Sequence, residues 1–289
     1  MIVLWFQQIN SMMLKLFDLK TVISIQKQYA TTGHSPYLVL TDNFEQYILK
    51  SPLNLNDKSS IVREFLCNQL LKIWQIKTPQ GACLKLSAFL LSSYYVQQNQ
   101  SLKKNKTFYG SLFVPNSIDL NQFFDVASKV DQRKIVNIET LLDIALFDIW
   151  VENDDRKPSN NNIILHPIKK HYQILPIDNA FTFATMNFDS LNPEYVSFSD
   201  NDSILHSSLG LSAISLATKN KNWVSIAENK FYLCIEFTKK SFQQICDTLP
   251  EEYNLSSEEC ECLKTFLFSQ ERNKKVFEQF KYIVSTAIK

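Results

Sequence analysis

The chain has 289 residues, of which 45% are hydrophobic, so it can bury a large core as one domain of two lobes or as two small domains. Its 30 Lys and Arg against 29 Asp and Glu give a formal net charge of +1, which supplies no strong field to favour nucleic acid or an anionic membrane as the obligatory partner. The six cysteines are scattered without His or Cys partners at zinc spacing, which favours reduced thiols and a cytoplasmic protein.

The first 17 residues are largely apolar. Gln7, Gln8, Asn10 and Lys15 interrupt them well short of the roughly 20 apolar residues that a membrane span needs. A basic segment and a small-residue cleavage site are also missing from this stretch, so neither a membrane anchor nor a secretory signal is expected.

Residues 37–50 predict two short strands around a Thr-Asp-Asn turn. Leu38 and Leu40 alternate with their neighbours at a period of two, as side chains on one face of a strand do. The second strand ends in Lys50.

Residues 59–74 predict an amphipathic helix that carries Glu64, because apolar residues recur there at helical spacing. The apolar run from Ala82 to Val96 fits either strand or helix, and the polar stretch Asn99–Thr107 predicts a solvated loop. Residues 108–114 then predict a short strand around Gly110.

A buried helix is predicted from residue 138 to residue 151. Asn137 would cap it, with Glu139 in the first turn, and apolar residues populate most of its sides. A second hairpin is expected over residues 162–178, followed by a long irregular loop over 179–209 that is rich in Asn, Ser and Asp, and then by two or three helices.

The loop after the buried helix has the composition of a phosphoryl-transfer site. It presents Asp155, Asn160 five residues later, and Asp178 beyond the hairpin. Asp155 would accept or orient the attacking hydroxyl, while Asn160 and Asp178 offer the hard oxygen ligands that hold Mg²⁺. The alternative is that Asp and Asn here only build surface turns, because their short side chains bond the local backbone.

Lys50 on a strand and Glu64 on the next helix would form the ion pair that aims an ammonium group at nucleotide phosphates. Each residue taken alone is better explained as a solvated side chain, and only their order and spacing with the other elements favour the ion pair. The order of strand lysine, helix glutamate, loop Asp and Asn, hairpin and strand-end Asp is that of a kinase.

The stretch "NDDRKPSN" followed by "ILPIDNAFTF" resembles the HipA-type kinases, in particular the compact HipA-like kinase domains, which are more distantly related to the phosphatidylinositol kinases. Asp155, Arg156 and Asn160 match the family's catalytic Asp, the following Arg and the metal-binding Asn, and Asp178 matches its strand-end metal Asp. The resemblance is strong over residues 143–183, weaker over 20–75 and only general after 225.

The sequence departs from the family at two places. Lys157 stands where many relatives carry a His, and "ATTGHSP" has a single glycine where eukaryotic protein kinases have three. The resemblance still implies a short phosphate loop, with backbone N–H groups around Gly33 and the hydroxyl groups of Thr31, Thr32 and Ser35 near phosphate.

The resemblance implies an α+β, bilobal protein-kinase-like fold. A small mixed α/β N-lobe would take residues 1–114, and a mainly helical C-lobe would take residues 115–289. The implied function is ATP- and Mg²⁺-dependent phosphorylation of a hydroxyl group, as a Ser/Thr protein kinase with an unidentified protein substrate. An antitoxin-like partner stays open, and direct nucleic-acid binding is not expected.

Two other readings stay open. The chain could be a nucleotide-binding pseudokinase or scaffold that keeps the fold without turnover, although Lys50, Asp155, Asn160 and Asp178 are all present. It could also phosphorylate a small molecule or a lipid, since one catalytic core serves several acceptors.

Overall fold

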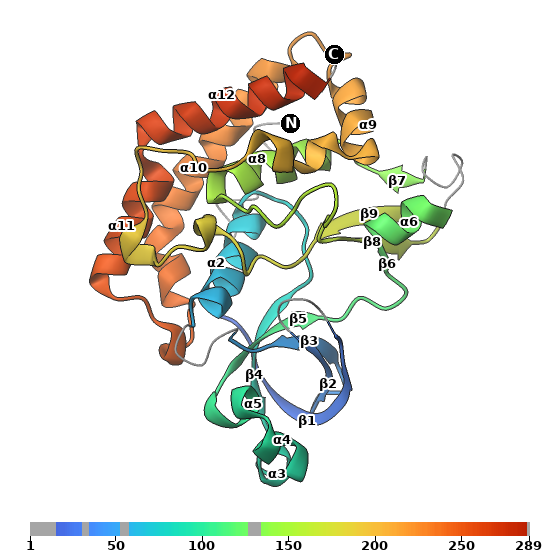
Figure 1. The fold of residues 1–289 in the computed structure, drawn as a ribbon, viewed down its shortest axis with the longest axis vertical. Helices are drawn as coiled ribbons and strands as arrows, with labels where there is room; N and C mark the ends of the chain where they lie inside the picture. The colour runs from blue at the N-terminus through green and yellow to red at the C-terminus, as the bar shows by residue number, and fades with distance from the viewer. Residues whose placement is uncertain (1–15, 31–34, 53–57, 127–133, 288–289) are drawn as a thin grey trace. The chain divides into compact units, whose positions relative to one another are not determined.

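The structure is a computed structural model that describes residues 16–30, 35–52, 58–126 and 134–287 (Figure 1). The chain divides into two compact units. Unit 1 comprises residues 1–70, 79–114 and 243–255, and unit 2 comprises residues 71–78, 115–242 and 256–289. Within the described ranges, no helix is both long enough and apolar enough to cross a bilayer.

Unit 1 contains a closed five-stranded barrel in the order β1-β2-β3-β5-β4. Its strands are Leu19–Gln28 (β1), Tyr37–Thr41 (β2), Gln46–Lys50 (β3), Gly81–Leu86 (β4) and Phe108–Leu112 (β5). The predicted hairpin of β2 and β3 and the predicted strand at Gly110 are present. β1 was not predicted from the sequence, and its parallel pairing with β4, from Leu19 opposite Cys83 to Val22 opposite Leu86, closes the barrel.

Gly110 is required by the packing of β4 against β5. A Cβ atom at this position would lie 2.6 Å from the Leu84 side chain, which fills the barrel. Glycine therefore lets the two strands approach while the leucine stays in the core.

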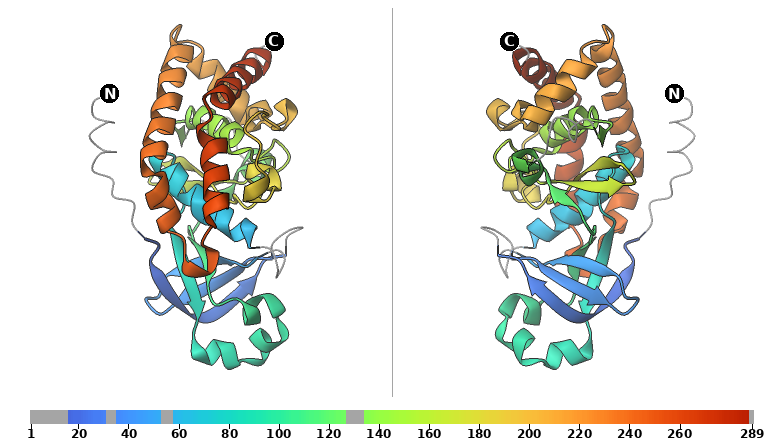
Figure 2. Two further views of the ribbon diagram at one scale, coloured as in Figure 1. Left: turned by 90° about the vertical axis from the view of Figure 1, so that its left-hand side faces the viewer. Right: turned by 90° about the vertical axis from the view of Figure 1, so that its right-hand side faces the viewer.

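Helix α2 (Ser59–Ile73) was predicted, and most of its residues are buried. Three short helices follow β4: α3 (Ala88–Ser92), α4 (Tyr94–Gln98) and α5 (Gln100–Lys104). They lie across one end of the barrel in both views of Figure 2 and add Leu90, Val96 and Leu102 to its core.

The prediction that Asn99–Thr107 is a solvated loop was wrong. Gln100–Lys104 is helical, because the Asn99 side chain accepts a hydrogen bond from the Leu102 backbone N–H at the helix start. The Leu102 side chain is fully buried in the barrel core, although most of its neighbours in the sequence are polar.

Unit 2 is built around α8 (Thr140–Val151), a helix that is buried on most sides. Trp150 of α8 stacks on Trp74 with ring centroids 5.0 Å apart, and the Trp150 indole N–H donates to Leu267 O at 3.1 Å. Unit 2 also contains α6 (Leu120–Val126), α9 (Ser208–Ala217), most of α10 (Trp223–Asp247), α11 (Ser257–Phe268) and α12 (Gln270–Ala287), and both α9 and α12 contact α8.

The predicted cap of α8 was wrong. Asn137 lies three residues before the helix with a φ of 53°, and Glu139 occupies the N-cap position without a capping hydrogen bond from its side chain. No side-chain cap therefore marks the start of this helix.

A four-stranded sheet of unit 2 has the order β6-β8-β9-β7. Its strands are Ile118–Asp119 (β6), Ile135–Val136 (β7), Ile163–Ile168 (β8) and His171–Pro176 (β9). β8 and β9 form the predicted hairpin, and Lys169 in its turn has a φ of 55°. Asp178 lies two residues beyond the end of β9, and the predicted irregular segment after it contains only short 3-10 turns before α9.

Candidate active site

The end of α8 is held in an unusual conformation. Glu152, the C-cap residue, has a left-handed φ of 50°, and its backbone N–H bonds the carbonyls of the last turn. Its buried carboxylate pairs with Arg272 Nη2 of α12 at 2.8 Å, and the same nitrogen donates to Trp150 O at 2.9 Å. A left-handed residue with a side chain costs about 1–2 kcal/mol, so this buried ion pair fixes the direction in which the chain leaves α8.

The carboxylate of Asp155 is held by two asparagines. Asn160 Nδ2 donates to Oδ1 at 2.9 Å, and Asn162 Nδ2 donates to Oδ2 at 2.7 Å. Asp155 itself is only partly buried. The two amide donors orient the carboxylate, which suits a group that accepts a proton or positions a hydroxyl.

Asn162 was missed by the sequence analysis. It stands in a run of three asparagines, and only its position two residues after Asn160 hints that both amides could face the same side. Its φ is 46°, a conformation that Asn adopts more readily than most residues.

Arg156 connects the loop of Asp155 with the segment that carries Asp178. Its side chain is fully buried and pairs with Asp148 of α8. The other terminal nitrogen, Nη2, donates to Ile177 O at 2.9 Å and to Asn179 Oδ1 at 3.0 Å. Both neighbours of Asp178 in the sequence are therefore bonded to the residue that follows Asp155.

A further contact supports the same connection. The Ile177 backbone N–H donates to Asn162 O at 2.9 Å. Asp178 follows with a φ of 58°, and Ala184, which has a φ of 49°, donates its backbone N–H to Glu152 O at 3.1 Å. Positive φ values at residues with side chains are typical of functional loops, because the surrounding bonds must hold them in place.

Burial shifts the pKa of two carboxyl groups near Asp155. It raises the pKa of Asp148 to about 7, against the opposing charge of Arg156 and a hydrogen bond from Asn153. It also raises the pKa of Asp154 to about 6, and the negative charges of Glu152 and Asp202 raise it further. A carboxylate beside a proposed catalytic residue thus titrates close to neutral pH.

Lys50 and Glu64 form the expected ion pair. Lys50 Nζ lies 2.5 Å from Glu64 Oε1, and both side chains are buried, at 7% and 1% exposed. A buried ion pair is weak evidence for stability, because desolvation offsets most of the attraction. The pair is therefore more easily explained by function, and its role toward phosphate stays a prediction.

Asn160 and Asp178 fit a magnesium ion by their chemistry. The Asn160 amide nitrogen is engaged with Asp155, so the side-chain oxygen is the atom it can offer to a cation. Among the described residues, no three His, Cys, Asp or Glu side chains gather at a metal site. Mg²⁺ suits such a sparse set, because it binds through one or two protein oxygens and completes its shell with phosphate and water.

The residues proposed for the phosphate loop can be placed only in part. Thr31, Thr32 and Gly33 lie outside the described residues. Ser35 is described and exposed, two residues before β2. The contribution of this loop to nucleotide binding stays a prediction.

Several solved structures are similar to this chain. The crystal structure of the Helicobacter pylori proinflammatory kinase CtkA aligns with a TM-score of 0.53 and 16% identity, covering 94% of this chain and 100% of that one. This similarity shows a fold of mixed helices and strands shared with a kinase.

Two more distant structures align with scores too low to support an inference. The Golgi casein kinase with Mn and ADP bound aligns with a TM-score of 0.44 and 9% identity, covering 98% of this chain and 77% of that one. The Rio2 kinase-ADP/Mg²⁺-phosphoaspartate complex from Chaetomium thermophilum aligns with a TM-score of 0.34 and 11% identity, covering 92% of this chain and 70% of that one.

The comparison with curated proteins returned no match. The family model described as "HipA-like kinase" matches residues 22–281. Because this match takes in most of the 289 residues, and the Asp155 loop with its asparagine partners lies inside it, the chain belongs to the HipA-like kinase family.

Proposed function

We propose that the chain transfers the γ-phosphate of ATP to a Ser or Thr hydroxyl group of a protein, in a reaction that requires Mg²⁺. The observation that carries this proposal is the Asp155 carboxylate, which Asn160 and Asn162 hold at 2.9 and 2.7 Å. Family membership supports phosphoryl transfer.

Each proposed residue has a separate role. The acceptor oxygen attacks the γ-phosphorus, the bond from the γ-phosphorus to the bridging oxygen breaks, and ADP leaves with that oxygen. Asp155 orients the hydroxyl group and takes its proton. Asn160 and Asp178 would hold Mg²⁺, which neutralises charge on the phosphates, and Lys50, positioned by Glu64, would bind phosphate oxygens.

Nucleotide binding gives the first test. At an ATP concentration of about 100 times Kd, binding adds about 2.7 kcal/mol to the free energy of unfolding. Each kcal/mol is worth about 2–4 °C in a chain of this size, so ATP with Mg²⁺ should raise the melting temperature by several degrees. Lys50→Met should reduce the shift, and Asp178→Ala should remove most of its Mg²⁺-dependent part.

The outcome separates the candidate functions. No shift in the wild-type protein at saturating ATP and Mg²⁺ would contradict the proposal. A shift without transfer of radiolabelled phosphate to any protein, lipid or small-molecule acceptor would favour a pseudokinase, and transfer to a lipid or small molecule alone would replace the protein acceptor.

A further inference from the structure

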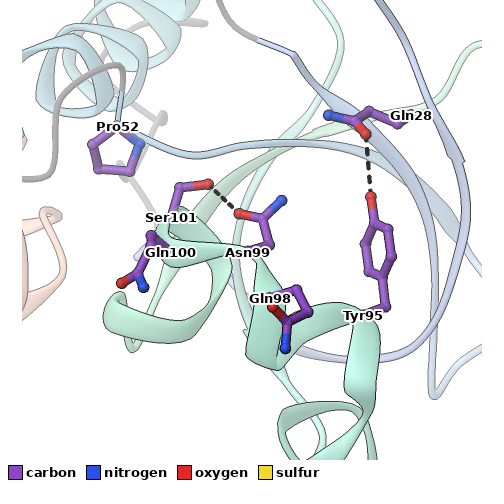
Figure 3. Close-up of a pocket in the computed structure, with 7 residues that line it drawn as sticks. All are labelled: Gln28, Pro52, Tyr95, Gln98, Asn99, Gln100 and Ser101. Carbon is purple, nitrogen blue, oxygen red and sulfur yellow. Dashed lines mark hydrogen bonds between the residues drawn. The ribbon is translucent and has the colours of Figure 1, made fainter.

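Unit 1 contains a cavity, here called the amide pocket, of about 490 Å³. It is lined by Gln28, Pro52 and Tyr95 and by residues 98–101 (Figure 3). All of these residues are uncharged. The volume lies within the range of ligand-binding pockets, but the lining is richer in amide groups than that of most small-molecule sites.

One wall of the amide pocket is fixed by hydrogen bonds. Asn99 Nδ2 and Gln28 Nε2 lie 2.5 and 3.2 Å from the hydroxyl oxygen of Tyr37, which is buried in the barrel. Tyr95 Oη donates to Gln28 Oε1 at 3.2 Å, and Ser101 Oγ donates to Asn99 Oδ1 at 2.8 Å, as Figure 3 shows. This part of the pocket is preorganised, so binding of a ligand would lose little side-chain entropy there.

Two carboxamides of the pocket are exposed and unused. The side chains of Gln98 and Gln100 make no hydrogen bond with any part of the chain that the structure describes. A carboxamide carries two N–H donors and one acceptor oxygen, which together match the C=O and N–H groups of a peptide backbone. The absence of charge among the lining residues that the structure describes disfavours phosphate, carboxylate and ammonium groups as ligands.

Helix α4, which lines the pocket, and the preceding helix α3, which does not, also expose large apolar side chains. Phe89 and Tyr94 are 79% and 81% exposed, and Tyr95 and Leu91 are exposed as well. Exposed aromatic side chains of this size on neighbouring turns are typical of surfaces that bind another polypeptide. They favour a peptide over a small polar solute, because a small polar solute would make no contact with these apolar side chains.

We propose that the amide pocket binds an uncharged, extended peptide segment of a protein partner, with Gln98 and Gln100 bonding its backbone. Naming that partner as the phosphate acceptor rests on the proposed kinase function, whereas peptide binding does not. The segment would dock through its backbone and small or apolar side chains, away from the hydroxyl group that receives phosphate.

The test uses the full chain and an array of short peptides with acetylated and amidated ends, built only from uncharged residues, beside the same peptides with Lys or Glu inserted. A subset of the uncharged peptides should bind, and an inserted charge should weaken them. Gln98→Ala with Gln100→Ala should lower the affinity about tenfold, because several backbone hydrogen bonds are lost. Both residues are exposed, so the variant should fold normally.

A matched control removes two other carboxamides from the same unit. Gln46 Nε2 donates to Gln26 Oε1 at 2.6 Å outside the pocket, so Gln26→Ala with Gln46→Ala should leave peptide affinity unchanged. The proposal is overturned if no uncharged peptide binds, if adenosine or glucose binds in the pocket while peptides do not, or if the Gln98 and Gln100 variant binds as the wild type does.

A kinetic measurement connects the pocket with catalysis. For an acceptor peptide that carries the bound segment, the Gln98 and Gln100 variant should raise KM about tenfold and leave kcat unchanged. An unchanged KM contradicts the acceptor assignment. Peptide binding without any phosphate transfer would instead contradict the proposed function and leave the pocket assignment in place.

Discussion

Arg156 Nη2 donates to Asn179 Oδ1 at 3.0 Å, so the residue after Asp155 is bonded to the residue after Asp178. These are the two acidic residues to which we assign acceptor activation and metal binding. Their spacing is therefore set by a buried guanidinium group and does not depend on the flexible acidic side chains themselves.

Removal of the guanidinium group tests this connection. Arg156→Met should lower the free energy of unfolding by about 3–5 kcal/mol, because Asp148 would stay buried without its partner. Urea denaturation measures the change. Asp148→Leu with Arg156→Met removes both charges and should recover part of the loss; a single variant within about 1 kcal/mol of wild type would contradict the argument.

Asp155→Asn should lower phosphate transfer by about 10²–10⁴-fold, the range for removal of a general base, and leave ATP affinity close to that of the wild type. Radiolabel transfer and nucleotide titration measure the two quantities separately. Asp189→Asn, an exposed carboxylate in the same unit, is the control. Full activity in Asp155→Asn would contradict the assignment of Asp155 as the residue that takes the proton of the acceptor hydroxyl group.

Asn162→Gly isolates the hydrogen bond to Asp155 Oδ2. Glycine accepts the φ of 46° at this position without strain, so only the side chain is lost. We expect kcat to fall about 10- to 100-fold with little change in ATP affinity, since one charge-assisted hydrogen bond is worth about 1.5–3 kcal/mol. Asn187→Gly, at an exposed site, is the control. An equal effect of both substitutions would argue against a positioning role.

Asp154→Asn should change the pH dependence of stability. The pKa of Asp154 is about 6 in the folded chain and near 3.8 when unfolded, so between these values the folded state holds a proton that the unfolded state has lost. The contribution of Asp154 to the free energy of unfolding is therefore greatest below pH 4 and falls as pH rises to 6.

The uncharged Asn avoids this loss. Relative to wild type, the variant should gain stability from pH 4 to pH 6 and show a constant difference above pH 7. Urea denaturation across this interval measures the trend. A difference that does not vary with pH would mean that Asp154 keeps its ordinary pKa in the folded chain.

Local sequence patterns determined much of unit 1 and the catalytic loop. The alternation in residues 37–50 and the helical spacing in 59–74 identified β2, β3 and α2, because apolar residues recur there at the period of a strand and of a helix. The predicted amphipathic character of α2 was wrong, since nearly all of its residues are buried. The order of Asp155, Asn160 and Asp178 also pointed to the kinase family before any contact was known. Their roles in catalysis stay predictions.

Only the tertiary structure decided which distant segments pack against one another. Arg272 in α12 pairs with Glu152 at 2.8 Å across 120 residues of sequence, and the parallel pairing of β1 with β4 closes the barrel. Neither contact leaves a local period or motif, because each depends on the folded path of the chain between the partners. The same is true of Leu102, which is buried in the barrel core although the segment that carries it is polar.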